Sequence, residues 1–220
     1  ISSYLRSPMR LCLASTSPAR LALLRAAGVE PLTEAPGVDE DAAVAEAGEL
    51  TPHDTVLLLA RLKAEEVAAR IAQLHPGFAG LVVGGDSMFE IDGRVYGKPH
   101  TPEAATARWH AMRGKTGVLH SGHWVIRVDD NGELTAAGEG AASPASFIAD
   151  ITDEEIAAYV ATGEPLKVAG AFTIDSLGGP FIERIEGDPS TVVGMSLPTL
   201  RRLAGELGVA WPRLWNRNDL

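Results

Sequence analysis

The stretch Leu11-Cys12-Leu13-Ala14-Ser15-Thr16-Ser17-Pro18-Ala19-Arg20 decides the fold, because it changes from one kind of structure to another within a few residues. Its apolar first half predicts a short buried strand, and its small hydroxyl residues predict a loop. Ser17 suits the N-cap of a helix and Pro18 suits the first helical position. The apolar run that follows ends at Gly28, which predicts the end of that helix.

A helix that begins in this way can also bind phosphate. Its first turn presents unpaired backbone N–H groups and the positive end of the helix dipole. The hydroxyls of Ser15 and Ser17 and the guanidinium of Arg20 lie beside that end. An ordinary strand–turn–helix cap would use the same residue types, so this stretch alone leaves both interpretations open.

The composition limits the classes of function. The 220 residues contain 19 basic and 29 acidic residues, a net charge of −10, which argues against a sequence-independent grip on DNA or RNA. The single cysteine, Cys12, allows no internal disulfide and fits a reducing, cytoplasmic setting. No apolar run reaches membrane-spanning length. We expect residues 1–9 to be a flexible leader and residues 10–220 to form one domain.

Two charged positions in the first third of the chain have two interpretations each. Glu40 belongs to the acidic cluster 38–41, predicted in a loop, where carboxylates are either solvated or ligands of a hard metal such as Mg²⁺. Lys63 lies in the middle of the apolar face of a helix predicted from Thr51 to Leu74. Burial of an unpaired ammonium is unfavourable, so Lys63 either reaches solvent or points into a cleft toward a negative group, which we favour.

The stretch Leu81-Val82-Val83-Gly84-Gly85-Asp86-Ser87 predicts a buried strand that ends at its two glycines. Asp86 and Ser87 would then lie at the carboxyl end of a strand, where open α/β sheets place their ligand sites. A hairpin turn at 92–93 would return the chain and bring Lys98 near Asp86. A purely structural Asp86–Lys98 ion pair is the alternative.

The second half of the chain continues the alternation of helices and strands. We expect a helix at 101–113, paired strands at 118–128 and 133–148, and a helix that starts in a capping box at Thr152. A further strand is predicted to end near Asp175, and the last helix is predicted to begin at 197–198. His120 and His123 are three apart on a strand and would face opposite sides, which argues against a metal site there. The pattern predicts one continuous α/β domain with two lobes.

Several motifs, in this order and spacing, resemble the Maf family. They are Leu13-Ala14-Ser15-Thr16-Ser17-Pro18-Ala19-Arg20, Val38-Asp39-Glu40, Ala60-Arg61-Leu62-Lys63-Ala64, Gly85-Asp86-Ser87, Gly97-Lys98-Pro99, the segment from Tyr159 to Gly170, and Val193-Gly194-Met195-Ser196-Leu197-Pro198. The resemblance covers residues 10–207. It implies a mixed central sheet with flanking helices and two lobes around an active-site cleft.

The resemblance also implies an activity. Maf proteins are nucleoside triphosphate pyrophosphatases, hydrolases that convert an NTP and water to an NMP and pyrophosphate with a divalent cation, Mg²⁺ or Mn²⁺. It further implies a cytoplasmic protein, often a homodimer, that acts on canonical or non-canonical nucleotides and is linked to septum formation. The alternative is a nucleotide-binding, septum-regulating protein with little turnover.

Site residues follow from the motifs position by position. Phosphate-binding positions correspond to Ser15, Ser17, Arg20 and Ser87, and catalytic positions to Glu40, Lys63, Asp86 and Lys98, with Glu40 and Asp86 as metal ligands.

The chain departs from the family pattern at three positions that bear on the site. Ala19 stands where the family usually has a second arginine, and Val168 follows Lys167 where Asp-Lys is common. Asp175 stands where many members have glutamine, so we expect it to contact the substrate and to alter recognition of the base.

Overall fold

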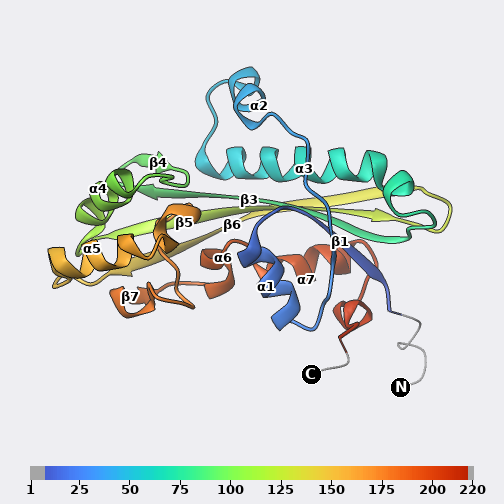
Figure 1. Ribbon diagram of the computed structural model, residues 1–220. Coiled ribbons are helices and arrows are strands. Elements are labelled where there is room, and N and C mark those ends of the chain that lie inside the picture. Colours follow the sequence, from blue (N-terminus) through green and yellow to red (C-terminus); the bar gives the residue numbers. More distant parts are fainter. Residues whose placement is uncertain (1–7, 218–220) are drawn as a thin grey trace.

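A computed structural model describes residues 8–217 as one mixed sheet with helices on both faces (Figure 1). The strands are β1 (Arg10–Ala14), β2 (Leu32–Thr33), β3 (Gly80–Ile91), β4 (Arg94–Tyr96), β5 (Thr116–Val128), β6 (Leu134–Phe147) and β7 (Ile182–Ile185). Their order is β2-β1-β3-β5-β6-β7, and β4 pairs with β3. β1 runs parallel to β2 and β3, and the other pairs are antiparallel. The predicted mixed α/β sheet is confirmed.

The α-helices begin where the sequence supplies a cap. They are α1 (Pro18–Ala26), α2 (Glu40–Ala47), α3 (Pro52–Leu74), α4 (Pro102–Met112), α5 (Asp153–Ala161), α6 (Pro189–Val193) and α7 (Leu197–Glu206). Each has a hydroxyl or carboxylate N-cap that accepts from the first turn, including Ser17 and the capping box at Thr152. α3 lies along one face of the sheet, and α1, α6 and α7 lie on the other (Figure 1).

α3 lies unusually close to the sheet because glycines face it. A Cβ on Gly84 would stand 2.1 Å from the carbonyl oxygen of Ala60, and one on Gly122 would stand 2.1 Å from that of Val56. Both carbonyls belong to α3, one turn apart. The backbone of α3 therefore rests directly on β3 and β5, and its height above the sheet is fixed.

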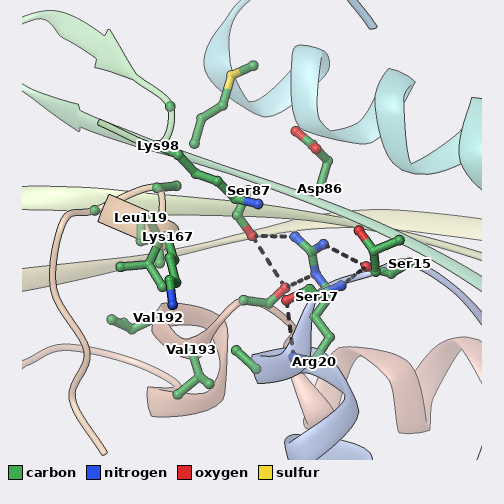
Figure 2. A pocket seen from close by; sticks show the side chains of 18 of the residues that line it. Ser15, Ser17, Arg20, Asp86, Ser87, Lys98, Leu119, Lys167, Val192 and Val193 are labelled. Carbon is green, nitrogen blue, oxygen red and sulfur yellow. Dashed lines mark hydrogen bonds between the residues drawn. The ribbon is translucent and has the colours of Figure 1, made fainter. Parts of the chain in front are cut away.

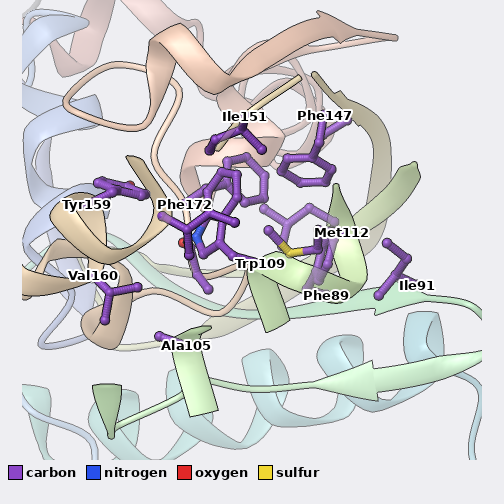
Figure 3. Close-up of a cluster of buried hydrophobic side chains, with 14 of the residues drawn as sticks. Phe89, Ile91, Ala105, Trp109, Met112, Phe147, Ile151, Tyr159, Val160 and Phe172 are labelled. Atoms are coloured by element: carbon purple, nitrogen blue, oxygen red, sulfur yellow. The ribbon is translucent and has the colours of Figure 1, made fainter. Parts of the chain in front are cut away.

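The hydrophobic core is divided between two lobes that share the long strands. One lobe surrounds α4 and α5 and contains a cluster of aromatic rings in edge contact, with Trp109, Phe147 and Phe172 at its centre (Figure 3). The other lobe packs α1 and α7 on one face of the sheet and α3 on the opposite face. β3, β5 and β6 run through both lobes and supply residues to the core of each.

Three predicted elements are wrong. β3 does not end at its glycines but continues through Asp86 to Ile91, because β5 pairs with it along this whole length. The acidic cluster begins α2 instead of lying in a loop, because the side chain of Asp39 caps the helix. No strand ends near Asp175, where a 3₁₀ helix (Glu164–Lys167) and irregular chain replace it.

The ends of the chain bear on two further predictions. The predicted leader, residues 1–9, lies mostly outside the described residues, although Met9 packs against the core and its N–H donates to the carbonyl of Arg213. Within residues 8–217, none of the helices is both long and apolar enough to cross a membrane.

Candidate active site

The candidate site lies at a gap in one edge of the sheet. The pairing of β1 with β3 stops at Ala14 opposite Gly84, and the pairing of β4 with the same edge of β3 starts only at Phe89. The edge of β3 between them is open, and a pocket of about 550 Å³ lies there. Successive residues of a strand face opposite sides of the sheet, so this opening joins two polar groups that a continuous sheet would separate.

The first group contains Asp86, Lys63 and Glu40. The ammonium of Lys63 lies 2.7 Å from an Asp86 carboxylate oxygen and 2.9 Å from a Glu40 carboxylate oxygen. The side chains of Lys63 and Asp86 are only 9% and 11% exposed, whereas that of Glu40 is 48% exposed. The prediction that Lys63 points into a cleft toward a negative group is confirmed.

Burial controls the acidity of Asp86. Desolvation raises the pKa of its carboxyl, while the charges of Lys63 and Arg20 act in the opposite direction and are outweighed. A carboxylate with a raised pKa is a better proton acceptor at neutral pH than a solvated one. Asp86 thus has the environment of a general base.

The second group surrounds Arg20 on the other face of β3 (Figure 2). Its Nε donates to the carbonyl of Gly194 at 2.8 Å, Nη1 donates to Ser15 Oγ at 3.2 Å and Nη2 donates to Ser87 Oγ at 3.0 Å. Arg20 is only 9% exposed, and burial lowers its pKa while Asp86 and Glu40 oppose that effect. All three hydrogen-bond acceptors are neutral, so its positive charge remains available to an anion in the pocket.

The loop after β1 is organised as the sequence predicts. Ser17 caps α1, its Oγ accepting from the N–H of Arg20 at 3.4 Å, and Ser15 Oγ accepts from the N–H of Ser17 at 3.1 Å. The N-terminus of α1 therefore opens on the pocket beside the guanidinium of Arg20. A helix N-terminus beside a guanidinium favours the binding of phosphate.

The sequence did not identify the residues whose hydrogen bonds hold Arg20 and Ser87 in place, which are Ser121, Thr191 and Gly194. Ser87 Oγ lies 2.9 Å from Ser121 Oγ, and the Ser121 hydroxyl donates to the carbonyl of Thr191 at 3.0 Å. Gly194, which accepts from Arg20, is distant in sequence and contributes a backbone oxygen, so no side-chain pattern could have identified it. The motif that contains it was visible, but its role was not.

His123, rejected as a metal ligand, is a satisfied core residue. Its Nδ1 lies 3.0 Å from the carbonyl of Glu139, and its Nε2 accepts from the N–H of Ser196 at 2.7 Å. Nδ1 therefore carries the proton of a neutral ring. Burial lowers the pKa of His123 to about 4. Its role is to fix the start of α7.

The opposite side of the pocket carries the remaining predicted residues. Lys98 and Lys167 line it and are exposed, and Leu119, Val192 and Val193 form an apolar wall (Figure 2). The alternative of an Asp86–Lys98 ion pair is wrong, because Asp86 pairs with Lys63. The three departures from the family pattern, which are Ala19, Val168 and Asp175, all line this pocket.

A divalent cation fits the acidic residues of the site. Glu40 and Asp86 come from different elements and already converge on one positive charge, the Lys63 ammonium. Residues 8–217 contain no group of three or more metal-ligating side chains. Two carboxylates completed by substrate phosphates are a typical Mg²⁺ arrangement, so the residues suit a cation that arrives with its substrate.

Comparisons with known proteins identify the relatives of this chain. The family profile of Maf-like proteins matches residues 10–207. A nucleoside triphosphate pyrophosphatase from Leifsonia xyli subsp. xyli is 62% identical over 95% of this chain and 98% of its own length. A nucleoside triphosphate pyrophosphatase from Salinispora tropica is 50% identical over 96% of this chain and 89% of its own length. One from Rhodococcus jostii is 50% identical over 92% of this chain and 94% of its own length.

Similarity to solved structures is much weaker. The crystal structure of a nucleoside-triphosphatase, a dITP/XTP pyrophosphatase from Mycobacterium abscessus, aligns over 91% of this chain and 98% of its own at a TM-score of 0.36 and 16% identity. A score that low does not establish a common fold. The profile match and the sequence identities do establish the family: this chain belongs to the Maf family.

Proposed function

We propose that the protein is a nucleoside triphosphate pyrophosphatase that hydrolyses (d)NTPs to (d)NMPs and pyrophosphate. The observation that carries the proposal is the open edge of β3, where the Asp86–Lys63–Glu40 cluster and the buried Arg20 line one pocket. Membership of the Maf family supports it, as do the names of the relatives.

Phosphate binding is assigned to the residues around the start of α1. Arg20, with Ser15 and Ser17 beside the helix N-terminus, would hold the phosphates. Lys63 and Lys98 would neutralise the triphosphate and the departing pyrophosphate. Phosphoryl transfer requires mainly positioning and charge stabilisation, and this pocket offers both.

Water activation is assigned to Asp86. Its carboxylate, directly or through a water that it orients, would take a proton from the water that attacks the α-phosphorus. The new bond joins the water oxygen to the α-phosphorus, and the bond from that phosphorus to the α–β bridging oxygen breaks. Pyrophosphate leaves with the electron pair, and the NMP retains the added oxygen.

Glu40 and Asp86 would hold Mg²⁺ or Mn²⁺. Bound there, the cation would contribute positive charge to the phosphate oxygens. Lys63 would then release at least one carboxylate and turn toward phosphate. We further propose a cytoplasmic enzyme that clears non-canonical nucleotides, has a link to septum control and assembles as a homodimer.

Pyrophosphate release tests the activity directly. The full chain is assayed with Mg²⁺ or Mn²⁺ against dTTP, UTP, CTP, ATP, GTP, ITP and 7-methyl-GTP, and a chelator serves as the control. We expect cation-dependent release of equal amounts of NMP and pyrophosphate from at least one nucleotide. Absence of release from every nucleotide, with nucleotides still raising the melting temperature, would favour the binding-protein alternative.

A further inference from the structure

The two ends of the pocket differ in chemistry. The end near α1 gathers the buried Arg20 and Lys63 with the serine hydroxyls, whereas the far end has an apolar wall that includes Leu119, Phe172 and Val192, with the exposed Lys98 and Lys167 beside it. The buried cations and the hydroxyls suit the phosphates, so, if the proposed function holds, the base lies against the apolar wall. Asp175 also lines the pocket and belongs to the segment that continues from Phe172.

Asp175 is a carboxylate without an internal partner. Glu40 and Asp86 are both paired with Lys63, but across residues 8–217 the Asp175 side chain has neither a hydrogen bond nor an ion pair. An ionised carboxylate only accepts hydrogen bonds. Asp175 is therefore a free acceptor at the rim of the site.

The loop that carries Asp175 is held at both of its ends. Glu164 accepts from Thr173 Oγ1 at 2.9 Å and from the N–H of Leu177 at 3.4 Å. The hydroxyl of Tyr159, which lies in the aromatic core, accepts from the N–H of Thr173 at 3.2 Å. These bonds bracket Asp175 on either side and restrict the positions that its carboxylate can take.

The surroundings of Glu164 favour its ionised form, which accepts the hydrogen bonds from this loop. Partial burial opposes its ionisation, but hydrogen bonds from Ser176, Tyr159, Thr173 and Leu177 outweigh that effect and lower its pKa. A carboxylate that collects several bonds from one loop fixes that loop more firmly than loop residues alone. Glu164 is thus a positioning residue, and it does not contact the pocket itself.

We propose that Asp175 selects the base, and that it favours bases with two adjacent N–H donors, as on the Watson–Crick edge of guanine. Its two oxygens match the N1–H and N2–H groups of guanine in parallel hydrogen bonds. Uracil and thymine present one N–H between two carbonyl oxygens, which a carboxylate repels. Glu164 maintains the selection by holding the 173–178 loop.

The comparison of GTP with ITP isolates this contact, because the two nucleotides differ only in the 2-amino group. We expect the wild-type chain to have a kcat/KM for GTP at least about tenfold above that for ITP. Asp175→Asn, which keeps the size but loses the second acceptor, should bring the ratio to within about twofold. The matched control is Asp41→Asn, which removes a carboxylate that lines the pocket elsewhere and should leave the ratio unchanged.

The positioning role of Glu164 has its own test. Glu164→Gln should lower the GTP/ITP ratio at least about threefold, and in combination with Asp175→Asn it should lower the ratio no further than Asp175→Asn alone. A general loss of structure would reduce kcat/KM for both nucleotides equally and leave the ratio intact. That result would remove Glu164 from the proposal.

Failure of the inference can be distinguished from failure of the proposed activity. Dissociation constants for α,β-methylene analogues of GTP and ITP give the same comparison without turnover. Equal values for the two analogues, or a preference that survives in Asp175→Asn, would overturn the selection by Asp175. If no nucleotide releases pyrophosphate but the analogues still differ, the proposed activity fails and the selection stands.

Discussion

At the scale of single residues, the chemistry of the site depends on Asp86. We predict that Asp86→Asn lowers the rate of pyrophosphate release at least about a hundredfold, because the amide cannot accept the proton of the attacking water. The fold should survive, because the substitution is isosteric and Lys63 keeps its contact with Glu40. The melting temperature and the circular dichroism spectrum check the fold, and unchanged turnover would remove Asp86 from the mechanism.

His123 makes a separate prediction about acid stability. The unfolded chain protonates this histidine near pH 6.5, whereas the folded chain resists protonation down to about pH 4. Between these values the unfolded state binds more protons, so stability falls as the pH falls, by on the order of 3 kcal/mol in total from this residue. Urea unfolding from pH 7 to 4 should show this loss in the wild type and a much shallower one in His123→Gln.

The sequence predicts some residues and not others for a clear reason. Lys63 could be found because helical periodicity places it among buried positions, and a buried ammonium requires a negative partner. The hydrogen bond from Arg20 to Gly194 joins residues 174 positions apart through a backbone oxygen. Nothing local in the sequence encodes such a contact.

At the scale of elements, the height of α3 above the sheet should be sensitive to a single methyl group. Gly84→Ala would place a Cβ 2.1 Å from the Ala60 carbonyl oxygen, so α3 must move outward and carry Lys63 with it. We predict a loss of about 2–3 kcal/mol in the free energy of unfolding and a reduced rate of pyrophosphate release. The control Gly205→Ala lies in α7 with open space around it and should be neutral or stabilising by up to about 1 kcal/mol.

Elements with local signals were predicted well. Helix starts at Ser17, Thr51 and Thr152 follow from side chains that cap the nearest backbone N–H groups. The continuation of β3 past Gly84 does not follow from the sequence, because the two glycines that suggest an end serve packing instead: Gly84 admits the backbone of α3 and Gly85 faces the side chain of Arg20. β3 continues because it pairs with β5, a strand that lies later in the sequence.

At the scale of the whole molecule, the two lobes should unfold together. β3 supplies Val83 to the core around α1 and Phe89 to the aromatic core, and β5 and β6 also cross between them. Loss of one lobe would expose half of the strands on which the other depends. We predict a single calorimetric transition whose van't Hoff and calorimetric enthalpies agree. Two resolved transitions would contradict the shared core.

The gap in the sheet is a property of the whole molecule, and the sequence does not reveal it. Its limits depend on where β1 stops and where β4 starts along the same edge of β3. The motifs indicated residues that the structure brings to one pocket. They did not show that Asp86 and Ser87 face opposite sides of one strand and reach a common pocket around its free edge.

Because α2 is exposed, hydrogen exchange in this helix should report whether the pocket is occupied. None of its residues is buried, yet its first residue, Glu40, contacts Lys63 inside the pocket (Figure 1). Its backbone amides should therefore exchange with deuterium quickly in the free protein and slowly once a nucleotide and cation engage Glu40. We expect the amides of α3, which packs directly on the sheet, to be protected in both states. Occupancy of the pocket could thus be followed at residues 40–47 in an unlabelled protein.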